Sequence, residues 1–128
     1  MKLLGIDYGT KRIGLAWADT TLSAVLPFGV IAKQTAAAPL KEIQELIVNE
    51  SIGKVIVGFP LGLDGQENRN TDRVKQFAFT LQKALNIPVE LFDERFTSQL
   101  ADRLARSDVS RDELAATAIL EGYLERNK

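Results

Sequence analysis

The sequence predicts a single α/β domain, residues 1–128, in which helices pack on a mixed β-sheet. Two observations lead to this class. Three strand-like segments open the chain, and the apolar spacing then changes to that of helices alternating with buried strands. The length of 128 residues is also enough for one proper hydrophobic core and too little for two.

The first three expected strands are Lys2–Tyr8, Ile13–Ala18 and Ala24–Ala32. The first two are joined by Gly9-Thr10-Lys11-Arg12, which is short enough for a hairpin. Pro27 lies inside the third segment and has no backbone N–H to donate. We therefore expect that strand at an edge of the sheet or interrupted by a bulge.

The remaining elements alternate along the chain. Apolar residues at helical spacing predict helices around Leu40–Ile47 and Val74–Leu85. Two further strands are predicted by "KVIVGFP", whose continuous apolar character is typical of a parallel strand covered on both faces, and by "IPVELFDERF". Two helices close the chain, one around Leu100–Ala105 and one after Ser110, where Glu113 completes a capping-box pattern.

Composition excludes several classes of protein. Apolar residues make up 45% and charged residues 26%, and the formal net charge of −1 means that a polyanion would have to bind a local patch. The chain has no cysteine and no histidine, which excludes disulfide scaffolds, thiolate metal sites and the most frequent general base. It has no apolar run of membrane-spanning length and no signal-peptide pattern. We therefore expect a cytoplasmic protein without a membrane partner.

Four acidic residues mark a candidate site. Asp7 ends the first strand, Asp93 and Glu94 end the last strand, and Asp112 begins the final helix. If the two strands are parallel, their carboxyl ends share the sheet edge where α/β folds bind ligands, and the final helix can point at the same edge. Converging carboxylates repel, and Mg²⁺ or Mn²⁺ would resolve the conflict. Two such ions would activate a water for attack on a phosphodiester.

Basic residues lie beside these acids. Lys11 and Arg12 in the hairpin turn, and Arg95 after Glu94, are candidates for holding a nucleic-acid backbone. Arg69, Arg73 and Lys75 can extend this basic patch, but a position on the solvent side of a helix explains them better.

Each of these residues also has an ordinary structural explanation. An Asp at a strand end often caps a turn, and Asp112 in a first helical turn is favoured by the helix dipole. Residues Asp93, Glu94 and Arg95 can form a solvated loop with a local ion pair. Judged by composition and spacing alone, these explanations outweigh a metal site.

Four segments in this order resemble the YqgF (RuvX) family of bacterial proteins: "GIDYGTKRIGLAWAD", "VGFPLGLDGQENRNT", "FDERFTS" and "DELAATAILEGYL". The resemblance covers essentially the whole chain. It implies a ribonuclease H-like fold, with a five-stranded mixed sheet whose first three strands form an antiparallel meander.

The resemblance also implies a metal-dependent nuclease in which Asp7, Glu94 and Asp112 are the catalytic acids. The family has been described as Holliday junction resolvases, by likeness to the RuvC resolvase. It is now assigned to maturation of the 5′ end of pre-16S ribosomal RNA. The implied partners are a structured RNA precursor, a ribosomal precursor particle or branched DNA, and the chain is expected as a monomer or homodimer.

One departure from the wider fold concerns the second acid. Many ribonuclease H-like nucleases carry it at the end of the strand next to the first acid, but here that strand ends in Gly58-Phe59-Pro60. The second acid must therefore come from Asp93 or Glu94, and the longer reach of Glu94 favours it. Asp64 is a weaker candidate for an auxiliary role.

Two other functions stay open. The segment "GIDYGT" also resembles the first phosphate loop of actin, sugar kinases and heat-shock ATPases, which bind ATP between two such domains. A chain of 128 residues cannot supply both domains. The other alternative is a catalytically silent nucleic-acid-binding module. Nothing in the sequence distinguishes RNA from DNA as the substrate.

Overall fold

The structure is a computed structural model that describes residues 1–22, 24–33, 38–61, 64–94 and 110–127. The elements in chain order are β1 (Lys2–Tyr8), β2 (Arg12–Asp19), β3 (Ala24–Ala32), α1 (Ala38–Asn49), β4 (Ile52–Phe59), α2 (Arg69–Ala84), β5 (Val89–Asp93) and α4 (Arg111–Arg126). The predicted helix around Leu100–Ala105 lies outside the described residues. Within the described ranges, no helix is long and apolar enough to cross a membrane.

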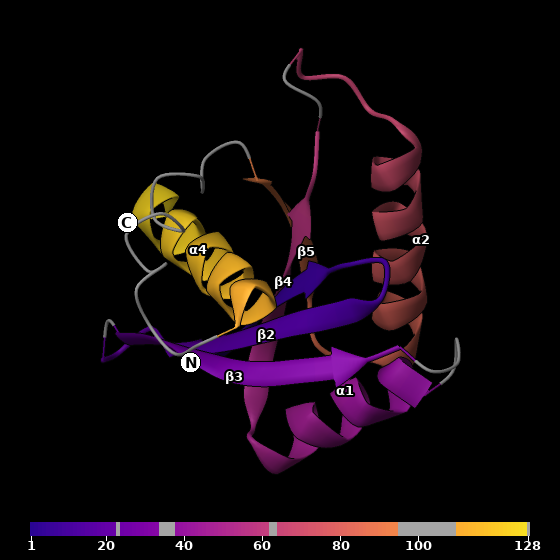
Figure 1. Cartoon of the computed structure of the whole chain (residues 1–128). Coiled ribbons are helices and arrows are strands. Elements are labelled where there is room, and N and C mark those ends of the chain that lie inside the picture. Colours follow the sequence, from indigo (N-terminus) through magenta and orange to yellow (C-terminus); the bar gives the residue numbers. More distant parts are fainter. Residues whose placement is uncertain (23, 34–37, 62–63, 95–109, 128) are drawn as a thin grey trace.

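The five strands form one mixed sheet in the order β3-β2-β1-β4-β5 (Figure 1). Strands β1, β2 and β3 are antiparallel neighbours, whereas β4 pairs parallel with both β1 and β5. This confirms the predicted meander and the predicted parallel half. As a result, β1, β4 and β5 all end at the same edge of the sheet.

The expectation for Pro27 is confirmed in both of its forms. Strand β3 lies at the edge of the sheet, and its register with β2 shifts between the Leu15–Gly29 and Ala16–Pro27 pairs. Phe28 is the extra residue of this bulge. Gly29 has a φ of 139°, a backbone conformation that residues other than glycine rarely adopt.

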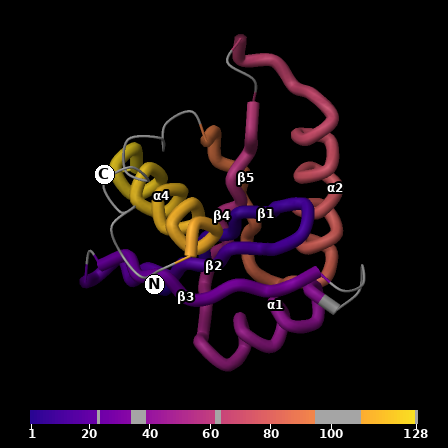
Figure 2. Tube along the Cα trace, in the orientation of Figure 1, coloured from indigo at the N-terminus to yellow at the C-terminus, as the bar shows by residue number. Residues whose placement is uncertain are grey.

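Helices cover both faces of the sheet (Figure 2). Helices α1 and α2 pack on one face, over a core of large aliphatic side chains from β1, β2 and β4. Helix α4 packs on the other face, where the sheet contributes several small residues. The molecule is therefore an α/β/α arrangement with the sheet in the middle.

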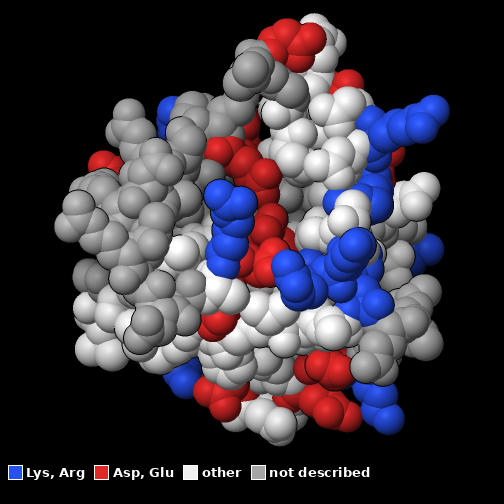
Figure 3. Space-filling view, viewed as in Figure 1, with Lys and Arg blue, Asp and Glu red and all other residues white. Residues whose placement is uncertain are grey.

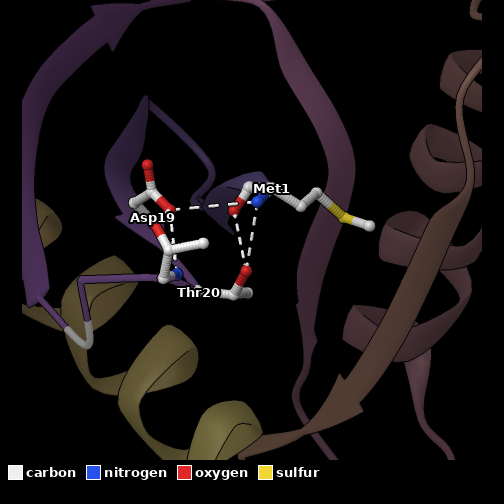
Figure 4. A network of polar contacts seen from close by, with 4 residues as sticks. Met1, Asp19 and Thr20 are labelled. Carbon is white, nitrogen blue, oxygen red and sulfur yellow. Dashed lines mark hydrogen bonds and ion pairs between the residues drawn. The ribbon is translucent and has the colours of Figure 1, made fainter.

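The end of the β1–β2 hairpin remote from the carboxyl edge is held by a polar network (Figure 4). The amino group of Met1 donates to Thr20 Oγ1 at 3.1 Å and lies 3.8 Å from Asp19 Oδ1. The Thr20 N–H donates to the Met1 carbonyl at 3.0 Å. These bonds continue the hairpin ladder beyond the Lys2–Asp19 pair, and in this register Asp7 faces Gly14 at the other end.

Both long helices that border the site begin at a side-chain cap. At α4, Ser110 Oγ accepts from the Glu113 N–H at 3.2 Å, as the capping pattern predicts. The Glu113 carboxylate, however, accepts from the Ser110 hydroxyl rather than from its backbone, so the box is only half formed. At α2, Asn68 and Thr71 form a complete reciprocal capping box.

Candidate active site

Three predicted acids lie at the carboxyl edge of the sheet. Asp7 points to the α4 face of β1, Glu94 directly follows β5, and Asp112 lies in the first turn of α4. All three side chains are partly buried. Figure 3 shows a band of Asp and Glu atoms on this side of the molecule, with Lys and Arg atoms on either side of it.

Two glycines next to Asp7 make room for the other acids. Gly14 of β2 is the pairing partner of Asp7, and a Cβ there would overlap the carbonyl oxygen of Asp112. Gly58 of β4 follows Val57, the partner of Ile6, and a Cβ there would overlap the Glu94 carboxylate. The missing side chains let α4 approach β2 and let Glu94 reach across β4.

Glu94 and Asp7 interact through a side-chain hydrogen bond. Burial, followed by the negative charge of Asp7, raises the pKa of Glu94 to about 7. Burial and then the charge of Asp112 raise the pKa of Asp7 above its usual value. Near neutral pH the pair therefore shares a proton, with the Glu94 carboxyl donating to the Asp7 carboxylate.

Asp112, the third acid, forms an ion pair with an arginine. Arg12 Nε donates to Asp112 Oδ2 at 3.0 Å. Asp112 acts on Asp7 through its charge, and within the described residues no three acidic side chains are grouped closely enough to form a ready-made metal site. Arg12, predicted to hold a phosphate, is thus paired with one of the acids.

Arg73 corrects the sequence-based expectation of a solvent-facing helix residue. Its guanidinium donates to the Gly9 carbonyl from Nη1 and to the Tyr8 carbonyl from Nη2, both at 3.1 Å. It also donates to Asn70 Oδ1 at 2.6 Å. Arg73 therefore fastens the turn after Asp7 to α2, and its positive charge partly counteracts the rise in the pKa of Asp7.

A pocket of about 190 Å³ opens beside the Asp7–Glu94 pair. Its lining combines the acidic pair with turn and helix residues from the opposite side: Asp7, Tyr8, Gly9, Thr10, Gly58, Pro60, Asn70, Arg73, Val74 and Glu94. The pocket contains an acidic wall and a cationic wall. Such a site can hold a cation against the acids and a phosphate against the arginine.

The donor set fits Mg²⁺ or Mn²⁺. Carboxylate oxygens are the ligands these hard cations prefer, and the shared proton of Asp7 and Glu94 marks a position where positive charge is favoured. A divalent cation would take the place of that proton. Asp112 acts on Asp7 through its charge, and it can become a further ligand of the ion if its ion pair with Arg12 breaks.

The other predicted site residues are more peripheral. Asp93, the last residue of β5, contributes to the raised pKa of Glu94 through its charge. Lys11 is exposed in the hairpin turn. Asp64 is exposed and accepts from the Gln66 N–H at 2.9 Å, which caps its own turn. Arg95 lies outside the described residues.

Sequence reasoning missed Gly14 and Gly58 as parts of this site, and it gave Arg73 only as the less favoured extension of the basic patch. A signal for the glycines was present, because glycine inside a strand often marks the close approach of another backbone or group. No comparable signal indicated that Arg73 would anchor the turn after Asp7. Its bonds to Tyr8 and Gly9 bridge more than sixty positions of sequence and depend on how α2 packs on the sheet.

The sequence is similar to one protein family over nearly its whole length. The family model described as "RuvX: Holliday junction resolvase" matches residues 1–126. A protein of Maridesulfovibrio salexigens, named "Putative pre-16S rRNA nuclease", is 38% identical and covers 98% of this chain and 99% of its own length. A protein of Moorella thermoacetica with the same name is 36% identical, with coverages of 98% and 96%.

Solved structures show the fold at much lower identity. The structure of T. thermophilus RuvC in complex with a Holliday junction substrate has a TM-score of 0.71 at 15% identity, covering 99% of this chain and 96% of RuvC. This likeness establishes the ribonuclease H-like fold. The match to a ROK hexokinase from Thermus thermophilus has a TM-score of 0.51 at 18% identity and covers 84% of this chain but 38% of the kinase. On the family model and the full-length relatives, this chain belongs to the RuvX family.

Proposed function

We propose that this chain is a divalent-metal-dependent nuclease that processes the 5′ end of pre-16S ribosomal RNA. The observation that carries the proposal is the hydrogen-bonded Asp7–Glu94 pair, which repulsion and burial keep partly protonated at the carboxyl edge of the sheet. The relatives' names supply the substrate class. A carboxylate pair that retains a proton near neutral pH is a place where a divalent cation gains affinity.

The roles of the residues follow from their contacts. Asp7 and Glu94 would hold the ion, and Glu94 would lose its shared proton when the ion binds. A bound ion supplies positive charge at the scissile phosphate and a water that ionises readily. Arg73 keeps the turn after Asp7 in place through the Tyr8 and Gly9 carbonyls. Asp112 is the third acid, and a phosphate that attracts Arg12 would release it.

The charge of the chain favours an RNA within a larger particle over a free DNA junction. The formal net charge is −1, so the chain as a whole does not attract a polyanion, and we expect few phosphate contacts. An enzyme that is brought to one position in a ribonucleoprotein obtains part of its affinity from the particle. A junction resolvase has to hold two duplex arms with its own surface, and would need paired sites in a dimer.

The test compares the two substrates side by side at physiological salt with Mg²⁺ or Mn²⁺. One substrate is pre-16S ribosomal RNA in its assembled particle, and the other is a mobile four-way DNA junction. We expect shortening of the RNA precursor by the wild type and by Asp19→Asn, an acid replaced at the opposite end of the same hairpin. Asp7→Asn should leave the precursor uncut.

Junction resolution is the second candidate, because the fold matches RuvC and the family model carries that description. Symmetric paired nicking of the junction, with the RNA precursor left untouched, would replace the RNA assignment and leave the metal site in place. Binding of both substrates without cleavage of either, at any concentration of Mg²⁺ or Mn²⁺, would instead support a catalytically silent module.

A further inference from the structure

A second pocket, of about 330 Å³, adjoins the pocket at the acids. The two share Tyr8 and Arg73, so the space beside Asp7 continues along α2. The second pocket adds Lys33, which follows β3, and the polar side chains of Gln76 and Thr80 on α2. Among the described residues that line it, none is acidic.

Two cations meet at the boundary between these pockets. Lys33 Nζ lies 4.0 Å from the centroid of the Tyr8 ring, and Arg73 Cζ lies 4.9 Å from the same centroid. Both also donate to the Gly9 carbonyl, at 3.3 Å from Lys33 and 3.1 Å from Arg73. Like charges at one ring and one carbonyl oxygen repel each other, and an anion in the pocket would relieve that repulsion.

The two cations keep capacity for a ligand. Arg73 uses three of its five N–H donors in bonds to protein, and Lys33 uses one of its three. Neither forms an ion pair within the part of the chain that the structure describes. The ring of Tyr8 is less available, because Phe77 stacks on it with centroids 4.0 Å apart and planes 14° apart.

We infer that the pocket between Lys33 and Arg73 binds a phosphate group of the substrate strand, next to the phosphodiester that lies at Asp7 and Glu94. This inference rests on the proposed nuclease function. It predicts that the nucleic-acid strand runs from the acids, past Arg73, toward Lys33 and Thr80. The contact is made by cations and neutral donors, and the Tyr8 ring is already stacked. The subsite therefore holds the backbone and does not select a base.

Lys33 is the residue that tests this inference. Arg73 anchors the turn beside Asp7 through three hydrogen bonds, so its replacement would disturb the acids as well. Lys33 contributes one long hydrogen bond to Gly9 and a ring contact. Lys33→Gln removes the charge and leaves the anchoring bonds of Arg73 in place. Lys2→Gln, at the opposite end of β1, is the control for loss of one positive charge.

The measurement is the binding of a fluorescent single-stranded RNA of mixed sequence, in EDTA so that no cleavage occurs, at a series of salt concentrations. Lys33→Gln should weaken binding and reduce the slope of log affinity against log salt by about 0.7, the value for one phosphate contact on a single strand. Lys2→Gln should keep the wild-type slope. Equal slopes for wild type and Lys33→Gln would overturn the inference.

A set of RNAs, each with one neutral methylphosphonate in place of a phosphate, locates the contact. In the wild type, one position close to the cleavage site should weaken binding when its charge is removed, and Lys33→Gln should no longer respond at that position. The same profile in both proteins would contradict the subsite. If Lys33 passes both tests while the wild type cleaves neither RNA nor DNA, the subsite stands and the nuclease proposal falls. If the wild type cleaves its substrate but Lys33→Gln binds RNA like the wild type in both tests, the nuclease proposal stands and the subsite falls.

Discussion

The two faces of the sheet are built from side chains of very different size. Toward α1 and α2, strand β1 presents Leu4 and Ile6, both fully buried. Toward α4, the same strand presents Gly5 and Asp7, and β2 adds Gly14. A Cβ on Gly5 would lie 3.0 Å from the Ala116 carbonyl, so the helix backbone rests almost directly on the strand.

Because of this difference, the α1–α2 face contributes mainly to stability and the α4 face carries the candidate catalytic acids. Each large aliphatic side chain on the α1–α2 face contributes about 1.5–3 kcal/mol through burial. The α4 face has fewer such side chains near its carboxyl edge, and the space is used to bring Glu94 and Asp112 to Asp7. Neighbouring residues of one strand should therefore respond to mutation in opposite ways.

Asp7→Asn is expected to have the largest effect on activity. Loss of a residue that hydrogen-bonds a metal ligand typically lowers metal affinity or activity by about 10–100-fold. Loss of a direct ligand should therefore lower the cleavage rate by more than about a hundred-fold. The fold should remain, with a melting temperature equal to or slightly above that of the wild type, since one of several repelling charges is gone. Cleavage at the normal rate would show that Asp7 is outside the site, and an unfolded variant would show that it is structural.

Ile6→Ala, one residue earlier on the opposite face, should do the reverse. The Ile6 side chain is fully buried among the aliphatic residues under α1 and α2, so its truncation should lower the free energy of unfolding by about 2–5 kcal/mol. Well below its melting temperature, the variant should cleave at a rate close to that of the wild type. Urea denaturation and a single-temperature cleavage assay, run on both variants, test the separation of the two faces.

Gly58→Ala tests the space that admits Glu94. The added Cβ would overlap the Glu94 carboxylate and the end of the Ile119 side chain, both of which can move. We expect a loss of stability of about 1–3 kcal/mol and a ten- to hundred-fold loss of cleavage, because Glu94 is displaced from Asp7. Gly53→Ala on the same strand is the control, since its Cβ would meet the flexible side chain of Met1. Equal activities of the two variants would contradict this role of Gly58.

Much of the fold was predictable because its patterns are local. The short turn between β1 and β2, the continuous apolar run of β4 and the proline of β3 each act within a few residues, and all three predictions are confirmed. The shared edge of Asp7 and Glu94 was predictable from strand direction, and that of Asp112 from the packing of the final helix on the sheet. These inferences needed only the order and the polarity of the elements.

The contacts within the site were not predictable in the same way. Pairing of Arg12 with Asp112 spans a hundred positions, and the anchoring of Gly9 by Arg73 spans sixty-four. Whether a basic residue in a turn faces a phosphate or an acid depends on how close α4 approaches β2. That distance is determined by Gly14, whose importance appears only when the helix is in place.

The pH dependence of stability is a smaller and more specific test of the α4 face. Glu94 has an ordinary pKa of 4.5 when unfolded and a pKa of about 7 when folded. Between these values the folded protein binds more protons, so the free energy of unfolding should decrease as pH rises from 4.5 to 7 and then level off. Glu94→Gln should flatten this part of the curve, whereas Glu42→Gln on the exposed surface of α1 should not.

Metal binding should offset the decrease in the free energy of unfolding at higher pH, because a divalent cation competes with the proton shared by Asp7 and Glu94. Mg²⁺ or Mn²⁺ should raise the melting temperature more above pH 7 than below it, and the rise should shrink in Glu94→Gln and Asp112→Asn. Thermal denaturation at two pH values, with and without the ion, gives both results. An identical shift at both pH values in all three proteins would place the ion elsewhere.

Arg12→Gln is expected to change stability least and to distinguish two functions of one side chain. The Arg12 side chain is 64% exposed and that of Asp112 is 24% exposed, so their ion pair should contribute less than about 1 kcal/mol. Its loss frees Asp112, and the rise in melting temperature caused by Mg²⁺ should become larger than in the wild type. RNA binding in EDTA should become weaker, because a cation beside the acids is lost. Lys11→Gln removes the same charge from the same turn without releasing Asp112, so it should weaken RNA binding and leave the metal response unchanged. If the two variants respond alike to Mg²⁺, the Arg12–Asp112 pair does not control access of the third acid to the metal.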